Sequence, residues 1–450
     1  MNQSYIQQGD SNETTLHGEY RISRSPATRH LINKDAAVYL HQALSTPVMN
    51  VIAKTEGAYL HDYEGNKYLD LHGNGVHNIG FNNQEVIDAV SQQLKAGLSF
   101  VPRRYTNEPA VAFAEQLTAV APAGLDRVLF CPGGSEAVEM AILLAKQVTG
   151  KWKTISFWDN YHGTTFQAAT VGGTEHFTTG NGPMVPGAFH VEFPNYYRNP
   201  FGLSPDEKEK IDDLYIRSIE VILKRHPDVA AIVGTTITST PNVPTSYFWQ
   251  RIRHLCDHHG IFLIFDEIVC GLGRTGKLFA CEYYVTPDVV VLGKSLGGGI
   301  MPFAGILTHE KHNVLQHRSI GHFTHEKNPL CCAAGLAALE FIEQNSIVQH
   351  AGELGDYFKN ELNDLKGRYP VIGHVEGRGL LLCADIVEDK TTKQRAPGKA
   401  SKIMYHCLKN GLSFKVIDGN VLTFRPSLII EKSEVDFIIA TLENAVRTVL

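Results

Sequence analysis

The fold is indicated first by the stretch IFLIFDEIVCGLGRTGKLFACEYYVTPDVVVLGK, residues 261–294. Two nearly continuous apolar runs stand in it, IFLIFDEI at 261–268 and DVVVLGK at 288–294. Such runs are typical of strands that are buried on both faces of a parallel sheet. Polar residues close each run, Asp266 in the first and Lys294 in the second. The stretch therefore predicts two buried strands with chemically useful side chains at their carboxyl ends.

Strands and helices alternate on the N-terminal side of this stretch. Apolar residues at helical spacing extend over 135–150 and over the segment that ends at Gly260. Such alternation implies a parallel sheet with right-handed crossovers, which binds ligands at the carboxyl ends of its strands. The other strands predicted in this part are RVLFC (127–131), KTISFW (153–158) and AAIVGTTI (230–237).

The length of 450 residues predicts two or three domains rather than one core. Residues 1–30 are rich in Ser, Asn, Gln and Gly, which predicts a mobile arm. We assign 76–335 to a large domain that carries the sheet. The N-terminal part of a small α+β domain is predicted at 31–75, and its C-terminal part at 336–450.

The overall composition is that of an ordinary globular protein, with 43% hydrophobic and 20% charged residues. The formal net charge of -6 gives no electrostatic reason to expect a nucleic acid or an anionic membrane as a partner. The polar N-terminus, and apolar runs all shorter than the roughly 20 residues of a membrane span, predict a soluble cytoplasmic protein. The eight cysteines form no CxxC pair, so we expect neither a disulfide framework nor a metal site.

Three features at strand ends carry possible chemistry, and each has an ordinary alternative. The glycine-rich segment Cys131–Ala137 opens a helix and suits an anion, although it also suits a simple turn capped by Ser135. Asp266 is a buried carboxylate that needs a cationic partner, or it bonds a loop backbone. Lys294 is a nucleophilic amine at a dry strand end, or it reaches into solvent.

Taken together, the three features describe one site. They supply a phosphate cradle, an acidic partner for a ring nitrogen and an amine that forms a Schiff base. That set suits pyridoxal 5'-phosphate (PLP), a cofactor that acts as an electron sink. A nucleotide site is disfavoured, because the sequence has no GxxxxGK[ST] pattern.

The sequence resembles the class III aminotransferases, which are PLP enzymes of fold type I. The segment FDEIVCGLGRTGKLFACEYYVTPDVVVLGKSLGGGIMPFAG (265–305) matches that family's signature nearly end to end. Further matches follow the family's order at GGSEAVEMA (133–141), YHGTT (161–165) and HFTHEKNPLCCAAGLAAL (322–339). The resemblance covers about residue 35 to the C-terminus. It implies an α/β fold with a large, mostly parallel seven-stranded sheet and a small α+β domain.

The resemblance also implies roles for residues around the cofactor ring. Lys294 is similar to the lysine that forms the Schiff base and shuttles a proton. Asp266 is similar to the aspartate that keeps the pyridine nitrogen protonated. Tyr161 resembles the aromatic residue stacked on the ring, and Ile268 the apolar residue on its other face.

Further residues are implied at the phosphate. Gly134 and Ser135 resemble the backbone cradle of the family. Thr324 resembles a threonine that reaches the phosphate of the neighbouring subunit. The resemblance therefore implies a homodimer with shared active sites, with or without further pairing into tetramers.

This sequence departs from the family at positions that handle the substrate. A glutamine near the cofactor's phenolic oxygen is replaced by Val269. Members that process α-amino acids have a Glu-Pro-(Ile/Val) strand end, where this sequence has Thr235, Thr236 and Ile237. Their carboxylate-binding arginine aligns with Thr423, although Arg425 lies two residues on and faces the same side of a strand. In the family that glutamate masks the arginine while a terminal amine is bound.

Loss of both halves of this switch favours an enzyme that accommodates one kind of substrate. Arg103 and Arg104 fall where the family places substrate-pocket residues, and a pair of arginines suits a phosphonate, although ordinary surface charge is the alternative. These features resemble one branch of the family, ammonia-lyases that act on a hydroxylated aminophosphonate. We predict conversion of 2-amino-1-hydroxyethylphosphonate to phosphonoacetaldehyde and ammonia. The alternatives are an ω-amine:keto-acid aminotransferase, with Arg425 as the substitute cation, and a phospho-lyase acting on a phosphorylated amino alcohol.

Overall fold

The computed structural model describes residues 11–450, which divide into two compact units. One unit is Asn83–Gln349, and the other combines Met1–Asn82 with His350–Leu450. Both boundaries lie further along the chain than the predicted ones. The first lies later because Phe81 exchanges two backbone hydrogen bonds with Gly57 and so belongs to the small unit. The second lies later because helix α10 (Pro329–Gln344) packs on helices of the large unit.

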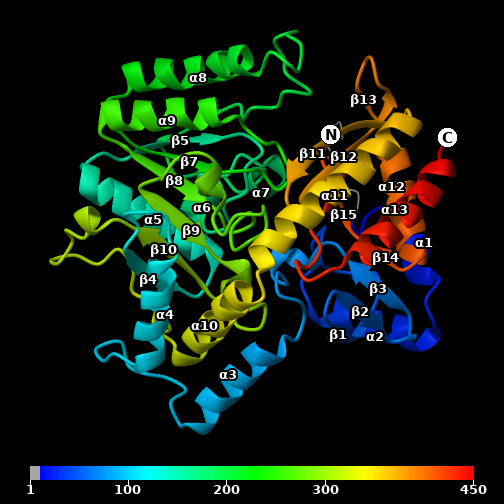
Figure 1. The fold of residues 1–450 in the computed structure, drawn as a ribbon, viewed down its shortest axis with the longest axis horizontal. Helices are drawn as coiled ribbons and strands as arrows, with labels where there is room; N and C mark the ends of the chain where they lie inside the picture. The colour runs from blue at the N-terminus through cyan, green and yellow to red at the C-terminus, as the bar shows by residue number, and fades with distance from the viewer. Residues whose placement is uncertain (1–10) are drawn as a thin grey trace. The chain divides into compact units, whose positions relative to one another are not determined.

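A seven-stranded sheet forms the centre of the large unit (Figure 1). Its strand order is β4-β10-β9-β8-β7-β5-β6, and β10 is antiparallel to both of its neighbours. The other neighbours pair in parallel, which confirms the predicted sheet. The strands are β4 (Arg127–Cys131), β5 (Lys153–Phe157), β6 (Ala188–Val191), β7 (Val229–Thr235), β8 (Phe262–Asp266), β9 (Val289–Leu292) and β10 (Ala304–Thr308).

Helices cover both faces of this sheet. Helix α5 packs on the strands at its centre, and α9 packs on β8 and on its neighbour α8 (Figure 1). Helix α10 packs on α3 and α4. The helices of this unit are α3 (Gln84–Lys95), α4 (Glu108–Ala119), α5 (Gly134–Thr149), α6 (Phe166–Val171), α7 (Glu175–Thr178), α8 (Lys208–Arg225), α9 (Ser246–His259) and α10.

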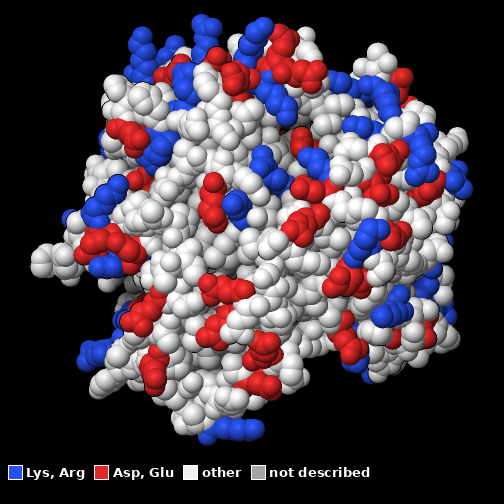
Figure 2. All heavy atoms as spheres, in the orientation of Figure 1, with Lys and Arg blue, Asp and Glu red and all other residues white. Residues whose placement is uncertain are grey.

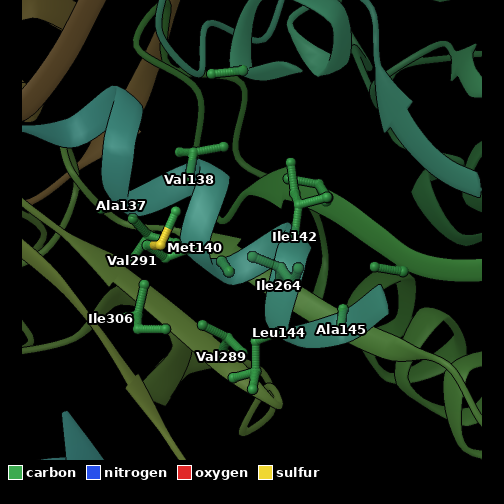
Figure 3. Close-up of a cluster of buried hydrophobic side chains, with 14 of the residues drawn as sticks. Ala137, Val138, Met140, Ile142, Leu144, Ala145, Ile264, Val289, Val291 and Ile306 are labelled. Atoms are coloured by element: carbon green, nitrogen blue, oxygen red, sulfur yellow. The ribbon is translucent and has the colours of Figure 1, made fainter. Parts of the chain in front are cut away.

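The core between α5 and the sheet fixes which way each strand faces. Figure 3 shows Val138 and Ile142 of α5 together with Ile264 of β8 and Val291 of β9, all in one fully buried cluster. Each such side chain contributes about 1.5–3 kcal/mol of burial. Since side chains alternate along a strand, Asp266 faces the same side as Ile264, toward α5.

The small unit contains two further sheets. One has the order β1-β2-β3-β14 and the other β11-β12-β16-β15, with β13 paired to β12. The hairpin predicted at 57–71 is present as antiparallel β2 and β3. The strands are β1 (Ile52–Glu56), β2 (Tyr59–Asp62), β3 (Lys67–Asp70), β11 (Ile372–Arg378), β12 (Leu381–Asp389), β13 (Gln394–Arg395), β14 (Leu412–Ser413), β15 (Lys415–Ile417) and β16 (Val421–Phe424). Besides two N-terminal helices, its helices are α11 (Ile347–Arg368), α12 (Pro397–Lys409) and α13 (Lys432–Arg447).

The segment predicted as a mobile arm differs from expectation in its described part. Residues 1–10 lie outside the described residues, but α1 (Thr15–Ile22) and α2 (Pro26–Val38) follow. Their N-caps are Thr14 and Ser25, whose side chains accept hydrogen bonds from backbone N–H groups of the first turn. The polar composition that predicted mobility therefore supplies helix caps instead.

The surface carries both signs of charge. Figure 2 shows acidic and basic side chains interspersed over the face drawn. All eight cysteines are buried free thiols. Over residues 11–450, no helix combines the length and apolar character that a membrane span requires.

Candidate active site

A cavity of about 200 Å³ lies at the carboxyl edge of the large sheet. Strands β5, β7, β8 and β9 run parallel, so their carboxyl ends meet at this edge. Strand β4 runs in the same direction, because β10 is antiparallel to both β4 and β9. The lining residues accordingly follow five strands, and they are Gly134, Ser135, Asp159–Gly163, Thr235, Thr238, Ser239, Asp266, Ile268, Val269 and Lys294.

The start of α5 forms one wall of the cavity. Its N-cap is a glycine, so no side chain caps the first N–H groups, which with the helix dipole attract an anion. A Cβ at Gly134 would lie 2.9 Å from Ile268 Cδ1, and one at Gly163 would lie 2.3 Å from Ser135 Oγ. The Ser135 hydroxyl accepts the Thr164 N–H at 3.2 Å, so Ser135 closes the next loop onto the helix and does not serve as the N-cap.

Asp266 ends β8 and is held by two donors. Its carboxylate accepts the His162 Nδ1–H at 2.7 Å and the Ile268 N–H at 3.0 Å. Asp266 is 4% exposed and His162 is 2% exposed. We did not predict a role for His162, although it stands in the motif YHGTT. Its partner lies 104 residues away in the chain, and only the strand order β8-β7-β5 brings the two together.

Lys294 begins the short helix η3 (Lys294–Gly297) directly after β9. Its backbone lies in the left-handed region at φ +49°. A residue with a side chain in that region costs about 1 kcal/mol or more, and such strain gathers at functional sites. The side chain is partly buried and lines the cavity with Asp266. The two residues predicted to act together therefore line the same cavity.

The loop after β5 supplies Tyr161. Its ring lies 4.8 Å from that of Phe177, and burial, followed by the Asp266 charge, raises the pKa of its hydroxyl. Asn160 fixes this loop, because its side-chain oxygen accepts the Thr235 N–H at 3.0 Å. Tyr161 and Ile268, the two predicted ring neighbours, both line the cavity.

The departures from the family pattern also lie in the cavity. Thr235 stands where a glutamate was expected and Val269 where a glutamine was expected, so this wall has neither group. Thr238 and Ser239 add two hydroxyls that the sequence analysis did not single out. The Thr238 hydroxyl donates to the Thr240 carbonyl at 2.5 Å, which holds the segment in a turn.

Four predicted residues do not line this cavity. Arg103 and Arg104 lie in an exposed turn, and Thr324 is exposed on another loop. Arg425 belongs to the small unit and is 5% exposed; its Nη2–H donates to His72 Nδ1 at 3.0 Å. Burial, followed by the Arg425 charge, holds the pKa of His72 well below its usual range, so the ring is a neutral acceptor.

The cavity fits PLP on its own geometry. An uncapped helix start suits a phosphate, a buried carboxylate with two donors suits a ring nitrogen, and a strand-end lysine lies within the same space. A Cβ at Gly134 would collide with Ile268, and a Cβ at Gly163 would collide with Ser135. This site on this sheet defines a PLP-dependent enzyme of fold type I.

Comparison with known proteins narrows that class. The family model for aminotransferase class-III matches residues 41–446. The chain is 38% identical to the (R)-1-hydroxy-2-aminoethylphosphonate ammonia-lyase of Vibrio splendidus, over 98% of this chain and 95% of that one. It is 32% identical to the taurine--pyruvate aminotransferase of Bilophila wadsworthia, over 89% and 92%. The structure of an (S)-enantioselective omega-transaminase from Thermomicrobium roseum superposes with a TM-score of 0.88 at 27% identity, over 95% and 100%. The chain belongs to the class III aminotransferase family.

Proposed function

We propose that this enzyme is a carbon–nitrogen lyase that acts on a small anionic primary amine. The substrate assigned is 2-amino-1-hydroxyethylphosphonate, and the products are phosphonoacetaldehyde and ammonia. The observation that carries the proposal is the 38% identity to an ammonia-lyase over nearly the whole length of both chains. The uncharged Thr235 in the cavity supports it, because an aminotransferase that alternates between two substrates needs a switch there.

Each residue of the cavity has its own role in this reaction. PLP, when bound, supplies the electron sink. The Lys294 amine takes the proton from the carbon that bears nitrogen. Asp266, held by His162, would keep the ring nitrogen protonated, while Gly134 and Ser135 would hold the phosphate. Tyr161 and Ile268 would contact the ring.

The reaction balances without a second substrate. The proton leaves the carbon that bears the amine, and the neighbouring hydroxyl departs as water. The carbon that bore the hydroxyl then takes up a proton and becomes a methylene, water adds at the carbon that bears nitrogen, and ammonia leaves. The aldehyde forms at that carbon, next to the methylene that carries phosphorus. Neither an oxidant nor a keto acid is consumed.

The phosphonate requires cations, and three arginines are candidates. Arg103, Arg104 and Arg425 each offer a planar fork that binds such an oxyanion in bidentate fashion. Arg103 and Arg104 are exposed in the single chain, so we propose that they and Thr324 complete the site of a neighbouring subunit in a homodimer. Arg425 is set in place by His72.

A second function has an observation in its favour. The 32% identity to a taurine--pyruvate aminotransferase supports an ω-amine aminotransferase on the same scaffold. In that case Lys294 would hold the proton and give it back within the site, and the amino group would pass to a keto acid through the electron-sink chemistry that PLP supplies. Thr423 favours the lyase over the aminotransferase. It is fully buried, and its hydroxyl donates to the Lys415 carbonyl at 2.9 Å, so it gives no charge where such enzymes have an arginine.

The two functions are separated by one measurement. The holoenzyme is incubated with 2-amino-1-hydroxyethylphosphonate and no keto acid, and ammonia and phosphonoacetaldehyde are followed together. Equal amounts of both, formed over many turnovers, are expected. Ammonia that stays absent while alanine forms on addition of pyruvate would establish the aminotransferase instead.

Two controls complete the assay. Lys294→Ala must form neither product, since the proton acceptor is gone. O-phosphoethanolamine tests the phospho-lyase alternative, which predicts inorganic phosphate together with ammonia. Phosphate release faster than phosphonoacetaldehyde formation would reassign the leaving group.

A further inference from the structure

A second carboxylate is held at the end of β8, directly after Asp266. Glu267 is 1% exposed and accepts three hydrogen bonds. The donors are the Ala280 N–H at 2.7 Å, the Cys281 N–H at 2.6 Å and the Thr236 hydroxyl at 3.0 Å. Thr236 follows β7, and the other two donors begin the short helix η2 (Ala280–Tyr283). Glu267 therefore joins three separate segments.

Glu267 stands between two residues that line the cavity, Asp266 and Ile268. Strand β8 ends at Asp266 and a turn begins at Ile268, so a fixed Glu267 constrains the backbone that carries both neighbours. Its backbone is fixed as well. The Glu267 N–H donates to the Val291 carbonyl at 2.9 Å, and its own carbonyl accepts the Gly271 N–H at 2.9 Å.

Stability alone does not explain a carboxylate in this position. Burial raises the pKa of Glu267 to about 7, which measures how unfavourable its charge is there. The donors named above are two backbone N–H groups and one hydroxyl. A well-packed apolar side chain commonly serves stability better than a buried charge.

Thr236 departs from the family pattern. Family members that process α-amino acids have proline at this place, and a proline ring has no hydroxyl to donate. Thr236 is fully buried, and its carbonyl accepts the Trp249 indole N–H at 3.1 Å. The replacement that left Thr235 in place of the switch glutamate therefore also added a donor for Glu267.

We propose that Thr236 and Glu267 form a positioning clip, which orients Asp266 and Ile268 and so sets the affinity of the site for its cofactor. Functional groups must be held within about 0.5 Å of their working geometry, and supporting hydrogen bonds provide this. The clip acts on cofactor binding, so it stands whether the enzyme expels or transfers ammonia.

The test compares cofactor affinity among variants of the full chain. Thr236→Val keeps the shape of the side chain and removes its hydroxyl, while Thr236→Ser keeps the hydroxyl. The dissociation constant of PLP is expected to rise roughly tenfold in T236V, because that is the effect of losing a hydrogen bond to a charged group. In T236S it is expected to change less than about twofold. Glu267→Gln is expected to weaken binding at least as much as T236V, because the amide nitrogen replaces one of the two acceptor oxygens and cannot accept a bond made there.

The matched control is Thr308→Val. Thr308 is buried at the end of β10 that lies away from the cavity, and its hydroxyl donates to the Asp288 carbonyl at 2.9 Å. The T308V substitution should lower the melting temperature about as much as T236V and leave PLP affinity unchanged. An unchanged affinity in T236V, or an equal loss in T308V, overturns the clip.

A measurement on the wild-type protein needs no variant. Hydrogen exchange of the Ala280 and Cys281 amides should be slow in the apoprotein as well as in the holoenzyme, because the chain forms the clip by itself. Rapid exchange of these amides in the apoprotein also overturns the proposal.

Discussion

The hydrogen bond between His162 and Asp266 gives the sharpest prediction about the site. Replacing His162 by leucine removes the Nδ1–H donor that lies 2.7 Å from the Asp266 carboxylate. That carboxylate is 4% exposed and keeps one other donor, the Ile268 N–H at 3.0 Å. A hydrogen bond to a charged group contributes about 1.5–3 kcal/mol, so its loss corresponds to roughly 10- to 150-fold in an equilibrium or rate constant.

The loss is expected in two quantities measured on the same protein. His162→Leu should lower kcat/KM for the amine substrate by roughly 10- to 150-fold. The same variant should weaken PLP binding, measured by titration of the apoprotein, because Asp266 is no longer oriented toward the ring nitrogen.

His162→Asn is the matched control. Its side-chain amide nitrogen takes up a position close to that of the imidazole Nδ1, so it restores a donor without the ring. H162N should recover most of both quantities. An H162L variant within about threefold of the wild type would contradict this role of His162. So would an H162N variant as impaired as H162L while both melt at the wild-type temperature.

Three other predictions concern residues of the cavity and its support. Lys294→Ala should abolish turnover and the visible band of the bound cofactor, roughly at 420 nm, in an absorbance spectrum; an unchanged band would assign the amine elsewhere. Gly163→Ala should lower the free energy of unfolding in urea by about 1–3 kcal/mol and weaken PLP binding, because Gly163 has φ +129° and a Cβ there would lie 2.3 Å from Ser135 Oγ. Wild-type values for both quantities would contradict the close approach. Glu267 should make the free energy of unfolding pH-dependent, because its pKa of about 7 in the folded state exceeds the ordinary 4.5. The folded state therefore binds the extra proton, and the contribution of Glu267 to the free energy of unfolding is lost as pH rises between those values. The difference in unfolding free energy between wild type and Glu267→Gln should fall by up to about 3 kcal/mol over that range, and a flat difference would contradict the raised pKa.

Much of the fold was open to prediction because its signals are local. The apolar runs at β7, β8 and β9 mark strands buried on both faces, and the helix of 135–150 ends at a glycine, as predicted. Strand β10 was not predicted. It is antiparallel to both of its neighbours, so it lacks the helical crossover by which the parallel strands were recognised. The described part of the N-terminal arm forms helices α1 and α2, which we did not predict, because its Thr14 and Ser25 act as helix caps.

The class of enzyme could be inferred from the sequence. Strands buried on both faces leave their carboxyl ends as the place for polar chemistry, so Asp266, Lys294 and the start of α5 were candidates by position, and the family resemblance implied their roles. What holds those groups depends on the tertiary structure. The bonds from His162 to Asp266, from the Thr235 N–H to Asn160 and from Thr236 to Glu267 join residues far apart in the chain. Their existence depends on which strands are neighbours, and no local spacing encodes strand order.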